Sequence, residues 1–172
     1  MNKFLLNTQK YLFILLPVTI ITGPFLSDLN LILFNIIFLI NIFVFKRTDL
    51  FKNNIFRIFA IWCIYILILS FFSDDIYLSL QSSLFYFRFV LFFLGVYFIL
   101  QISNKNLLYF FLSSLFVFLF VIFDSFYQFF FQYDFFGYEY TRYRLSGLFG
   151  DEKILGSYLS RLLPLILGLL FI

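Results

Sequence analysis

The sequence contains no histidine and a single cysteine, Cys63, which lies inside an apolar run. One cysteine cannot form a disulfide within the chain, and without histidine the usual zinc ligand sets cannot be assembled. We therefore expect no metal site and no cofactor.

Charged residues are also scarce: they make up 12% of the 172 residues, whereas hydrophobic residues make up 63%. A soluble domain has about 25% charged and about 45–50% apolar residues, so this composition indicates a protein that resides in lipid. The net charge of +3 is small and spread along the chain, which argues against nucleic acid as a partner.

Apolar runs separated by short polar segments predict an all-α, polytopic membrane bundle with about six spans in a single transmembrane domain. The expected spans are approximately 11–27, 31–45, 58–72, 84–100, 107–131 and 154–172, with a polar loop at 132–153. We expect Asp28 and Asn30 to form a tight turn between the first two spans, and a loop at 73–83. The first two spans are near the lower length limit, so they form either a short hairpin or a partly re-entrant one. A cleaved signal peptide is disfavoured because no small-x-small cleavage site follows the first run.

The basic residues predict the orientation of these spans, because cytoplasmic loops carry an excess of Lys and Arg. With the N-terminus in the cytoplasm, three basic residues lie outside, namely Arg142, Arg144 and Lys153, and seven lie inside, namely Lys3, Lys10, Lys46, Arg47, Lys52, Arg57 and Lys105. The 132–153 loop is then expected on the periplasmic side of a bacterial inner membrane.

Three ionisable residues fall within predicted spans: Arg88, Asp124 and Arg161. At 1.5 Å per residue each lies roughly 6–11 Å inside the outer end of its helix. Such a group costs about 2.5–3.5 kcal/mol to insert and usually faces protein or water. Arg88 could instead extend its head to the interface. The side chain of Asp124 is too short to reach the interface, so it needs a proton or a partner such as Arg88 or Arg161. Such a pair would be either a structural ion pair or part of a functional site.

Polar residues form a stripe on the helix that carries Asp124. Asp124, Gln128 and Gln132 recur every four residues, with Ser113 three turns earlier, so they share one helix face. This face either lines a cavity beside the 132–153 loop or forms a polar interface between helices.

The arginines of the loop and of the neighbouring spans suggest an anion site. Arg142 and Arg144 outside, with Arg88 and Arg161 below them, would form a cationic funnel at headgroup depth. Guanidinium groups bind phosphate through paired hydrogen bonds. The sequence therefore predicts a membrane-embedded phosphate or pyrophosphate as the ligand.

The glycine-rich segment 146–151 is a second candidate part of this site. With Gly147 and Gly150 it could present backbone N–H groups to an anion, and Asp151 could cap the helix that follows. The same composition is equally typical of a loop and helix cap without any ligand.

The run from Arg144 to Arg161, RLSGLFGDEKILGSYLSR, resembles the Arg-x-x-Gly-x-Phe segment of the O-antigen polymerase and O-antigen ligase superfamily. The run Tyr86-Phe87-Arg88-Phe89 is similar to the arginine-bearing helix of that family. The resemblance implies a helical inner-membrane glycosyltransferase that takes a glycan from undecaprenyl pyrophosphate on the periplasmic side, without a metal or nucleotide sugar. The acceptor would be lipid A core or a growing glycan, and Arg88 and Arg144 would bind the pyrophosphate.

The chain departs from that family in being shorter and in lacking the large periplasmic loop with a further arginine and a histidine. We therefore expect the chain to be the N-terminal portion of such an enzyme, without a catalytic residue that can be named. The alternative is a non-enzymatic small membrane protein or part of a lipid-glycan flippase or transporter. A transporter would be expected to show paired halves, and the sequence has no internal repeat.

Overall fold

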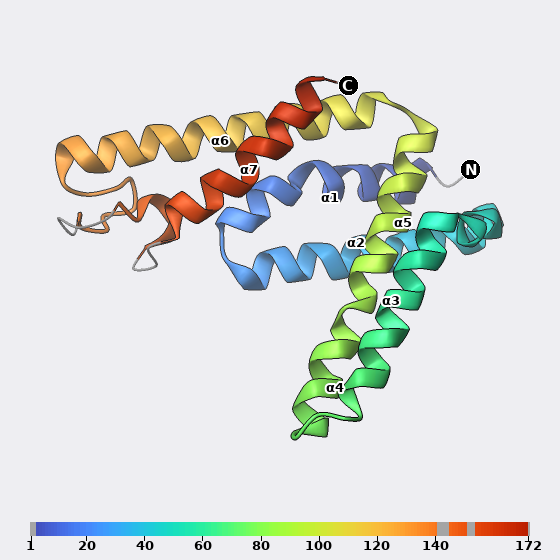
Figure 1. Cartoon of the computed structure of the whole chain (residues 1–172). Helices are drawn as coiled ribbons and strands as arrows, with labels where there is room; N and C mark the ends of the chain where they lie inside the picture. Colours follow the sequence, from blue (N-terminus) through green and yellow to red (C-terminus); the bar gives the residue numbers. More distant parts are fainter. Residues whose placement is uncertain (1–2, 141–144, 151–153, 172) are drawn as a thin grey trace. The chain divides into compact units, whose positions relative to one another are not determined.

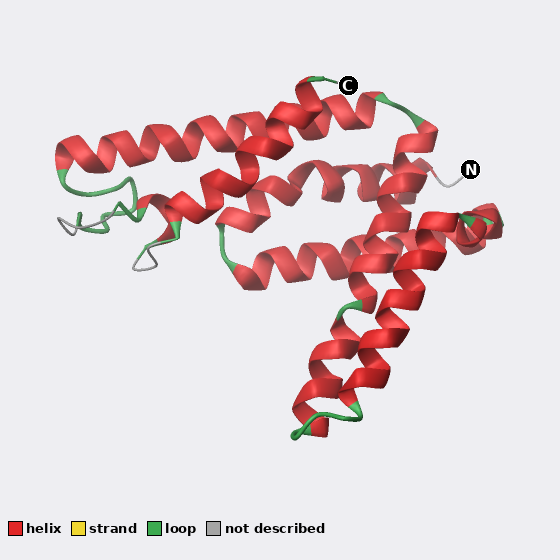
Figure 2. Ribbon diagram, in the orientation of Figure 1, coloured by secondary structure: helices red, strands yellow, loops and turns green. Residues whose placement is uncertain are grey.

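A computed structural model describes residues 3–140, 145–150 and 154–171 of the chain, and over these ranges the regular structure is helical, with no strand (Figure 1; Figure 2). The helices are α1 (Lys3–Ile21), α2 (Pro24–Phe45), η1 (Thr48–Lys52), α3 (Asn54–Ser70), α4 (Ile76–Phe85), α5 (Phe87–Ile102), α6 (Lys105–Phe131), η2 (Gly147–Phe149) and α7 (Leu155–Leu170). The predicted all-α class is confirmed.

In the described part of the chain, four helical stretches are long and apolar enough to cross a membrane: α1, α2, the α4–α5 stretch Ile76–Ile102, and α6. The apolar helices α3 and α7 are shorter, at 17 and 16 residues. The helical membrane class follows from these four, whereas the expected count of six spans stays a prediction.

The turn between α1 and α2 lies at Thr22 and Gly23, so the expected turn at Asp28 and Asn30 is wrong. Gly23 has φ +113°, which residues with a side chain rarely adopt. Pro24 then begins α2 at a position where its missing N–H costs nothing. Asp28 and Asn30 are inside α2. Because the turn comes earlier and α1 begins at Lys3, both helices are longer than expected, at 19 and 22 residues.

The segment expected to be a loop at 73–83 is mostly helix α4. Asp75 is its N-cap, and its Oδ1 accepts a hydrogen bond of 3.1 Å from the N–H of Leu78. This bond satisfies a backbone donor that the first turn leaves unpaired, which explains why the helix begins there. Only a short stretch around Ser73 and Asp74 remains irregular.

The chain divides into two compact units, and each is considered by itself. The first comprises Met1–Phe13 and Leu29–Asn104, and the second comprises Ile14–Asp28 and Lys105–Ile172.

In the first unit, helix α3 packs against α4 and α5. Helix α2 meets α5 at Gly95, where the fully buried rings of Phe34 and Phe38 lie directly over the glycine. A Cβ at Gly95 would be 2.5 Å from Cε1 of Phe34. The small residue therefore permits this close approach, as is common where membrane helices pack. Between α1 and α2, the buried amide of Asn41 donates a 2.7 Å hydrogen bond to Oε1 of Gln9.

In the second unit, α6 packs against α7 and against η2. The segment between α6 and α7 folds back onto the end of α6, and it carries most of the candidate site.

Candidate functional site

The segment that follows α6 begins with a tight hairpin over residues 132–140. The N–H of Tyr140 donates to the carbonyl of Gln132 at 2.7 Å, and the N–H of Asp134 donates to the carbonyl of Tyr138 at 3.0 Å. The buried carboxylate of Asp134 closes the turn, since its Oδ1 accepts from the N–H groups of Phe136 at 3.0 Å and Tyr138 at 2.7 Å. Gly137 has φ +88°, which the turn requires of its last residue.

Gln128 of α6 fastens the rest of this segment to the helix. Its Oε1 accepts from the N–H groups of Ser146 at 3.1 Å and Gly147 at 2.9 Å. Its Nε2 donates to the carbonyl of Tyr138 at 3.3 Å and to Oγ of Ser146 at 3.1 Å. The side chain is fully buried. All its hydrogen-bonding capacity is therefore used to hold its own chain.

Asp124 lies one turn earlier on α6 and is also fully buried. Its Oδ1 accepts a 3.1 Å hydrogen bond from the N–H of Phe135, whereas its Oδ2 has no hydrogen-bond partner among the described residues. A Cβ on Gly147 would lie 3.3 Å from this Oδ2 and 3.3 Å from Oγ of Ser125. The expectation for Asp124 is a proton or a partner such as Arg88 or Arg161; among the described residues it forms no ion pair with Arg161, and its Oδ1 bonds the backbone of the hairpin.

The polar stripe on α6 is thus an interface, but with the chain's own loop rather than with another helix. Asp124 and Gln128 are buried beneath the loop, whereas Gln132 is exposed and donates to the carbonyl of Phe129 at 3.1 Å. Ser113 is half-buried. The loop covers the middle of the stripe, so these residues do not face an open cavity beside it.

The two candidate glycines take up conformations with positive φ. Gly147 has φ +54° and begins η2. Gly150 has φ +61°, and a Cβ added to it would lie 3.1 Å from Cζ of Tyr138. The N–H groups of Ser146 and Gly147 are already occupied by Gln128. The N-cap residue of α7 is Ile154, and the expected cap, Asp151, lies outside the described residues.

Arg161 of α7 lines a cavity of about 470 Å³ within the second unit. The remaining lining is mostly apolar, with three further hydroxyl side chains: Leu16, Pro17, Ile20, Phe110, Ser114, Ile154, Ser157, Tyr158, Leu162 and Leu165. The hydroxyl of Tyr158 is buried and has no partner in the described ranges. The cavity therefore combines one guanidinium group and several hydroxyl groups with a hydrocarbon-like wall.

Arg88 belongs to the first unit, near the start of α5. Its guanidinium carbon lies 4.9 Å from the ring centroid of Phe89 and 5.6 Å from that of Phe85. Its carbonyl accepts a 2.8 Å hydrogen bond from Nδ2 of Asn35. The cation is thus held over aromatic faces, an arrangement that stabilises a guanidinium group in a poorly hydrated place.

The predicted site residues therefore separate into three groups. Asp124 and Gly147 are brought together, and Gly150 lies nearby on the same loop. Arg161 lines its own cavity, and Arg88 is in the other unit, so the predicted convergence of the arginines stays a prediction. Arg142, Arg144 and Asp151 lie outside the described residues.

Three participants were missed from the sequence. Asp134 is followed three residues later by Gly137, a spacing typical of a turn closed by an Asp side chain, and this signal could have identified it. Ser157 and Tyr158 of the cavity had no comparable signal, because they sit in an apolar helix whose face becomes known only from its packing.

Comparison with known proteins returns no matching family model, no matching curated protein and no matching solved structure. The resemblance to the O-antigen polymerase and ligase superfamily therefore rests on the quoted residues alone.

Proposed function

We propose that this chain supplies a lipid-pyrophosphate-binding surface to a membrane glycosyltransferase that polymerises or ligates glycans carried on undecaprenyl pyrophosphate at the periplasmic face. The observation that carries the proposal is the cavity at Arg161. Arg161 is exposed, lines this cavity and forms no ion pair with a described residue, so its charge can face a ligand there.

The lining of this cavity fits an anionic lipid better than a soluble metabolite. Apolar side chains from α1, α6 and α7 surround Arg161, and the hydroxyl groups of Ser157 and Tyr158 are further donors. A prenyl chain would lie against the apolar wall, and a phosphate group would accept paired hydrogen bonds from the guanidinium.

The chemistry proposed requires only binding and charge stabilisation from these residues. Pyrophosphate is the leaving group of the transfer, and a fixed guanidinium stabilises the charge that develops on it. The acceptor would be lipid A core or a growing glycan, and the quoted Arg-x-x-Gly-x-Phe resemblance supports this substrate class.

The test is the binding of undecaprenyl pyrophosphate to the complete protein, purified in detergent. Arg161→Gln removes the charge and is expected to weaken binding at least about tenfold, since a hydrogen bond to a charged group contributes about 1.5–3 kcal/mol. Arg161→Lys should retain part of the affinity, because it keeps the charge but loses the paired geometry. In membranes, Arg161→Gln should lower the rate of glycan transfer in proportion to the loss of binding affinity.

Two controls separate this effect from general damage. Lys3→Gln removes one positive charge from an exposed position at the start of α1 and should leave binding unchanged. Ser157→Trp fills the cavity without changing charge and should weaken binding as Arg161→Gln does. Full affinity in both the Arg161→Gln and Ser157→Trp proteins would refute the proposed site.

A further inference from the structure

The polar segment of residues 46–57, between α2 and the first turn of α3, has a defined structure, and we call it the platform. Its 3-10 helix η1 buries Leu50, which is 2% exposed. The ring of Phe51 packs edge-on against Phe56, with ring centroids 5.5 Å apart. Asn53 caps α3 by accepting a 3.0 Å hydrogen bond from the N–H of Ile55. These contacts give the segment between α2 and α3 a defined structure.

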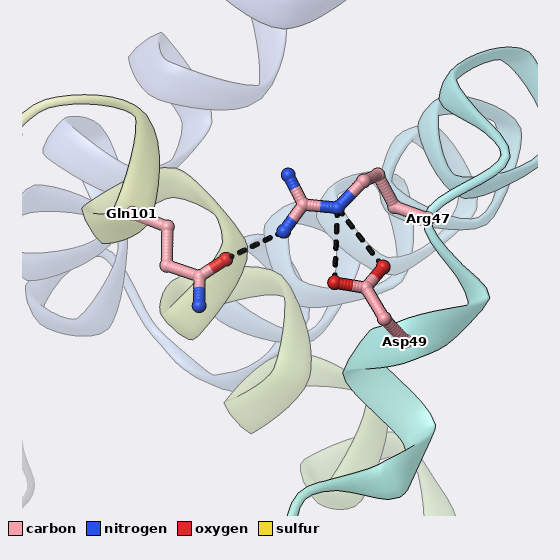
Figure 3. A network of polar contacts seen from close by, with 3 residues as sticks. All are labelled: Arg47, Asp49 and Gln101. Atoms are coloured by element: carbon pink, nitrogen blue, oxygen red, sulfur yellow. Dashed lines mark hydrogen bonds and ion pairs between the residues drawn. The ribbon is translucent and has the colours of Figure 1, made fainter.

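Arg47 ties this platform to the end of α5 (Figure 3). Its Nε donates to both carboxylate oxygens of Asp49, at 2.9 and 3.2 Å, and its Nη2 donates to Oε1 of Gln101 at 3.0 Å. Asp49 is the single acid between residues 46 and 57. The charge of Arg47 is therefore compensated within the platform.

The three other cations of the platform lack a direct ion pair among the described residues, although the charge of Lys52 also acts on the Asp49 carboxyl. Lys46, Lys52 and Arg57 are exposed, and none forms an ion pair with a residue in the described ranges. Lys46 follows the end of α2, Lys52 ends η1, and Arg57 is in the first turn of α3. Three exposed positive charges therefore lie within twelve positions of one structured segment.

Exposed apolar side chains flank these cations along both helices. Phe43 of α2 is 79% exposed, and Ile58 of α3 is 68% exposed. A soluble acidic partner would meet only the charges, whereas a phospholipid has a phosphate for the cations and acyl chains for these apolar side chains. The combination of charge and apolar surface thus favours a lipid.

We propose that Lys46, Lys52 and Arg57 form a binding surface for anionic phospholipid headgroups in the leaflet on that side of the membrane. Juxtamembrane Lys and Arg attract anionic lipids, each by up to about fivefold in local concentration. The proposal concerns the first unit only, and it does not depend on the glycosyltransferase proposal.

Trp62, the single tryptophan of the chain, provides the readout. It is in α3, is 58% exposed, and follows Arg57 by five residues, or about 7.5 Å along the helix. The complete protein would be reconstituted in phosphatidylcholine vesicles that contain a fixed fraction of either brominated phosphatidylglycerol or brominated phosphatidylcholine, with bromines high on the acyl chains. The proposal predicts that phosphatidylglycerol quenches Trp62 more strongly than phosphatidylcholine at the same fraction.

The salt dependence tests the wild-type protein directly. At about 1 M salt the screening length falls to about 3 Å, so the excess quenching should disappear. Equal quenching by both lipids at low salt would overturn the proposal without any variant.

Two triple variants test the residues. Lys46→Gln, Lys52→Gln and Arg57→Gln together should abolish the excess quenching. Lys46→Arg, Lys52→Arg and Arg57→Lys together conserve the charge and should retain it. Excess quenching that persists in the glutamine triple would show that these cations are not the binding surface. The emission maximum in unbrominated lipid, which should match that of the wild type, checks that α3 is intact.

Discussion

Gln128 is the side chain whose replacement should have the largest local effect. Its four hydrogen bonds join α6 to Tyr138, Ser146 and Gly147. A hydrogen bond of this kind contributes about 0.5–1.5 kcal/mol net, so Gln128→Leu should destabilise the closed loop by about 4 kcal/mol. Because leucine also leaves two buried N–H groups without an acceptor, the loop should open rather than stay closed and unsatisfied.

Hydrogen exchange measured on peptides covering residues 145–150 reports this opening. Each 1.4 kcal/mol corresponds to a factor of ten, so exchange should accelerate by up to about a thousandfold, while the middle of α6 keeps its protection. Gln132→Leu is the matched control, because Gln132 directly follows the last residue of α6 and its side chain donates only to the carbonyl of Phe129. If the Gln128→Leu protein exchanged at the wild-type rate in this loop, Gln128 would not be the residue that holds the loop closed.

Two further predictions concern the first unit. Gly95→Ala places a Cβ 2.5 Å from the ring of Phe34 and should lower stability in detergent by about 1–3 kcal/mol, measured as a reduced Tm. Gly168→Ala is the control, because the space around Gly168 is open and its Tm should not change. Equal Tm values for the two variants would refute the packing argument. The Arg47 guanidinium, through its hydrogen bond and charge, holds the pKa of the Asp49 carboxyl below its ordinary value. The contribution of this pair to stability is therefore present above about pH 4 and is lost as the pH falls through the lowered pKa. A carboxyl titration by NMR should show the Asp49 midpoint rise in Arg47→Gln, and an unchanged midpoint would contradict the assignment.

The helical membrane class was predictable because it depends on composition and on long apolar runs. The position of the first turn was not, since Asp28 and Asn30 are typical turn residues while Gly23 and Pro24 lie inside an apolar run. The backbone decided the outcome: Gly23 adopts a positive φ and Pro24 begins a helix at no cost. Polar residues such as Asn30 are then tolerated within α2, where its Nδ2 donates to the carbonyl of Leu12 at 3.2 Å.

Of the candidate site, the sequence predicted only which residues of one helix share a face. The four-residue interval correctly placed Asp124 and Gln128 on one face of α6, but it could not identify what covers that face. The spacing carries no information about a loop that returns over the helix, because its contacts join residues up to 19 positions apart, such as Gln128 and Gly147. Charge complementarity suggested an arginine for Asp124, whereas the structure supplies the N–H of Phe135.

The loop and the polar stripe of α6 stabilise each other, and this bears on where chemistry can occur. Without the loop, Asp124 and Gln128 would present polar groups to lipid, at a cost of several kcal/mol for each unsatisfied group. Without these side chains, the N–H groups of Phe135, Ser146 and Gly147 would lose their acceptors, and Ser146 and Gly147 are buried. This mutual satisfaction accounts for Gln128 and for Oδ1 of Asp124, whereas Oδ2 of Asp124 has no partner among the described residues. Among the described residues of the second unit, the guanidinium of Arg161 and the hydroxyl of Tyr158 take no part in these contacts, and both line the same cavity. A substitution of Arg161 should therefore affect ligand binding without opening the loop, whereas a substitution of Gln128 should open the loop first.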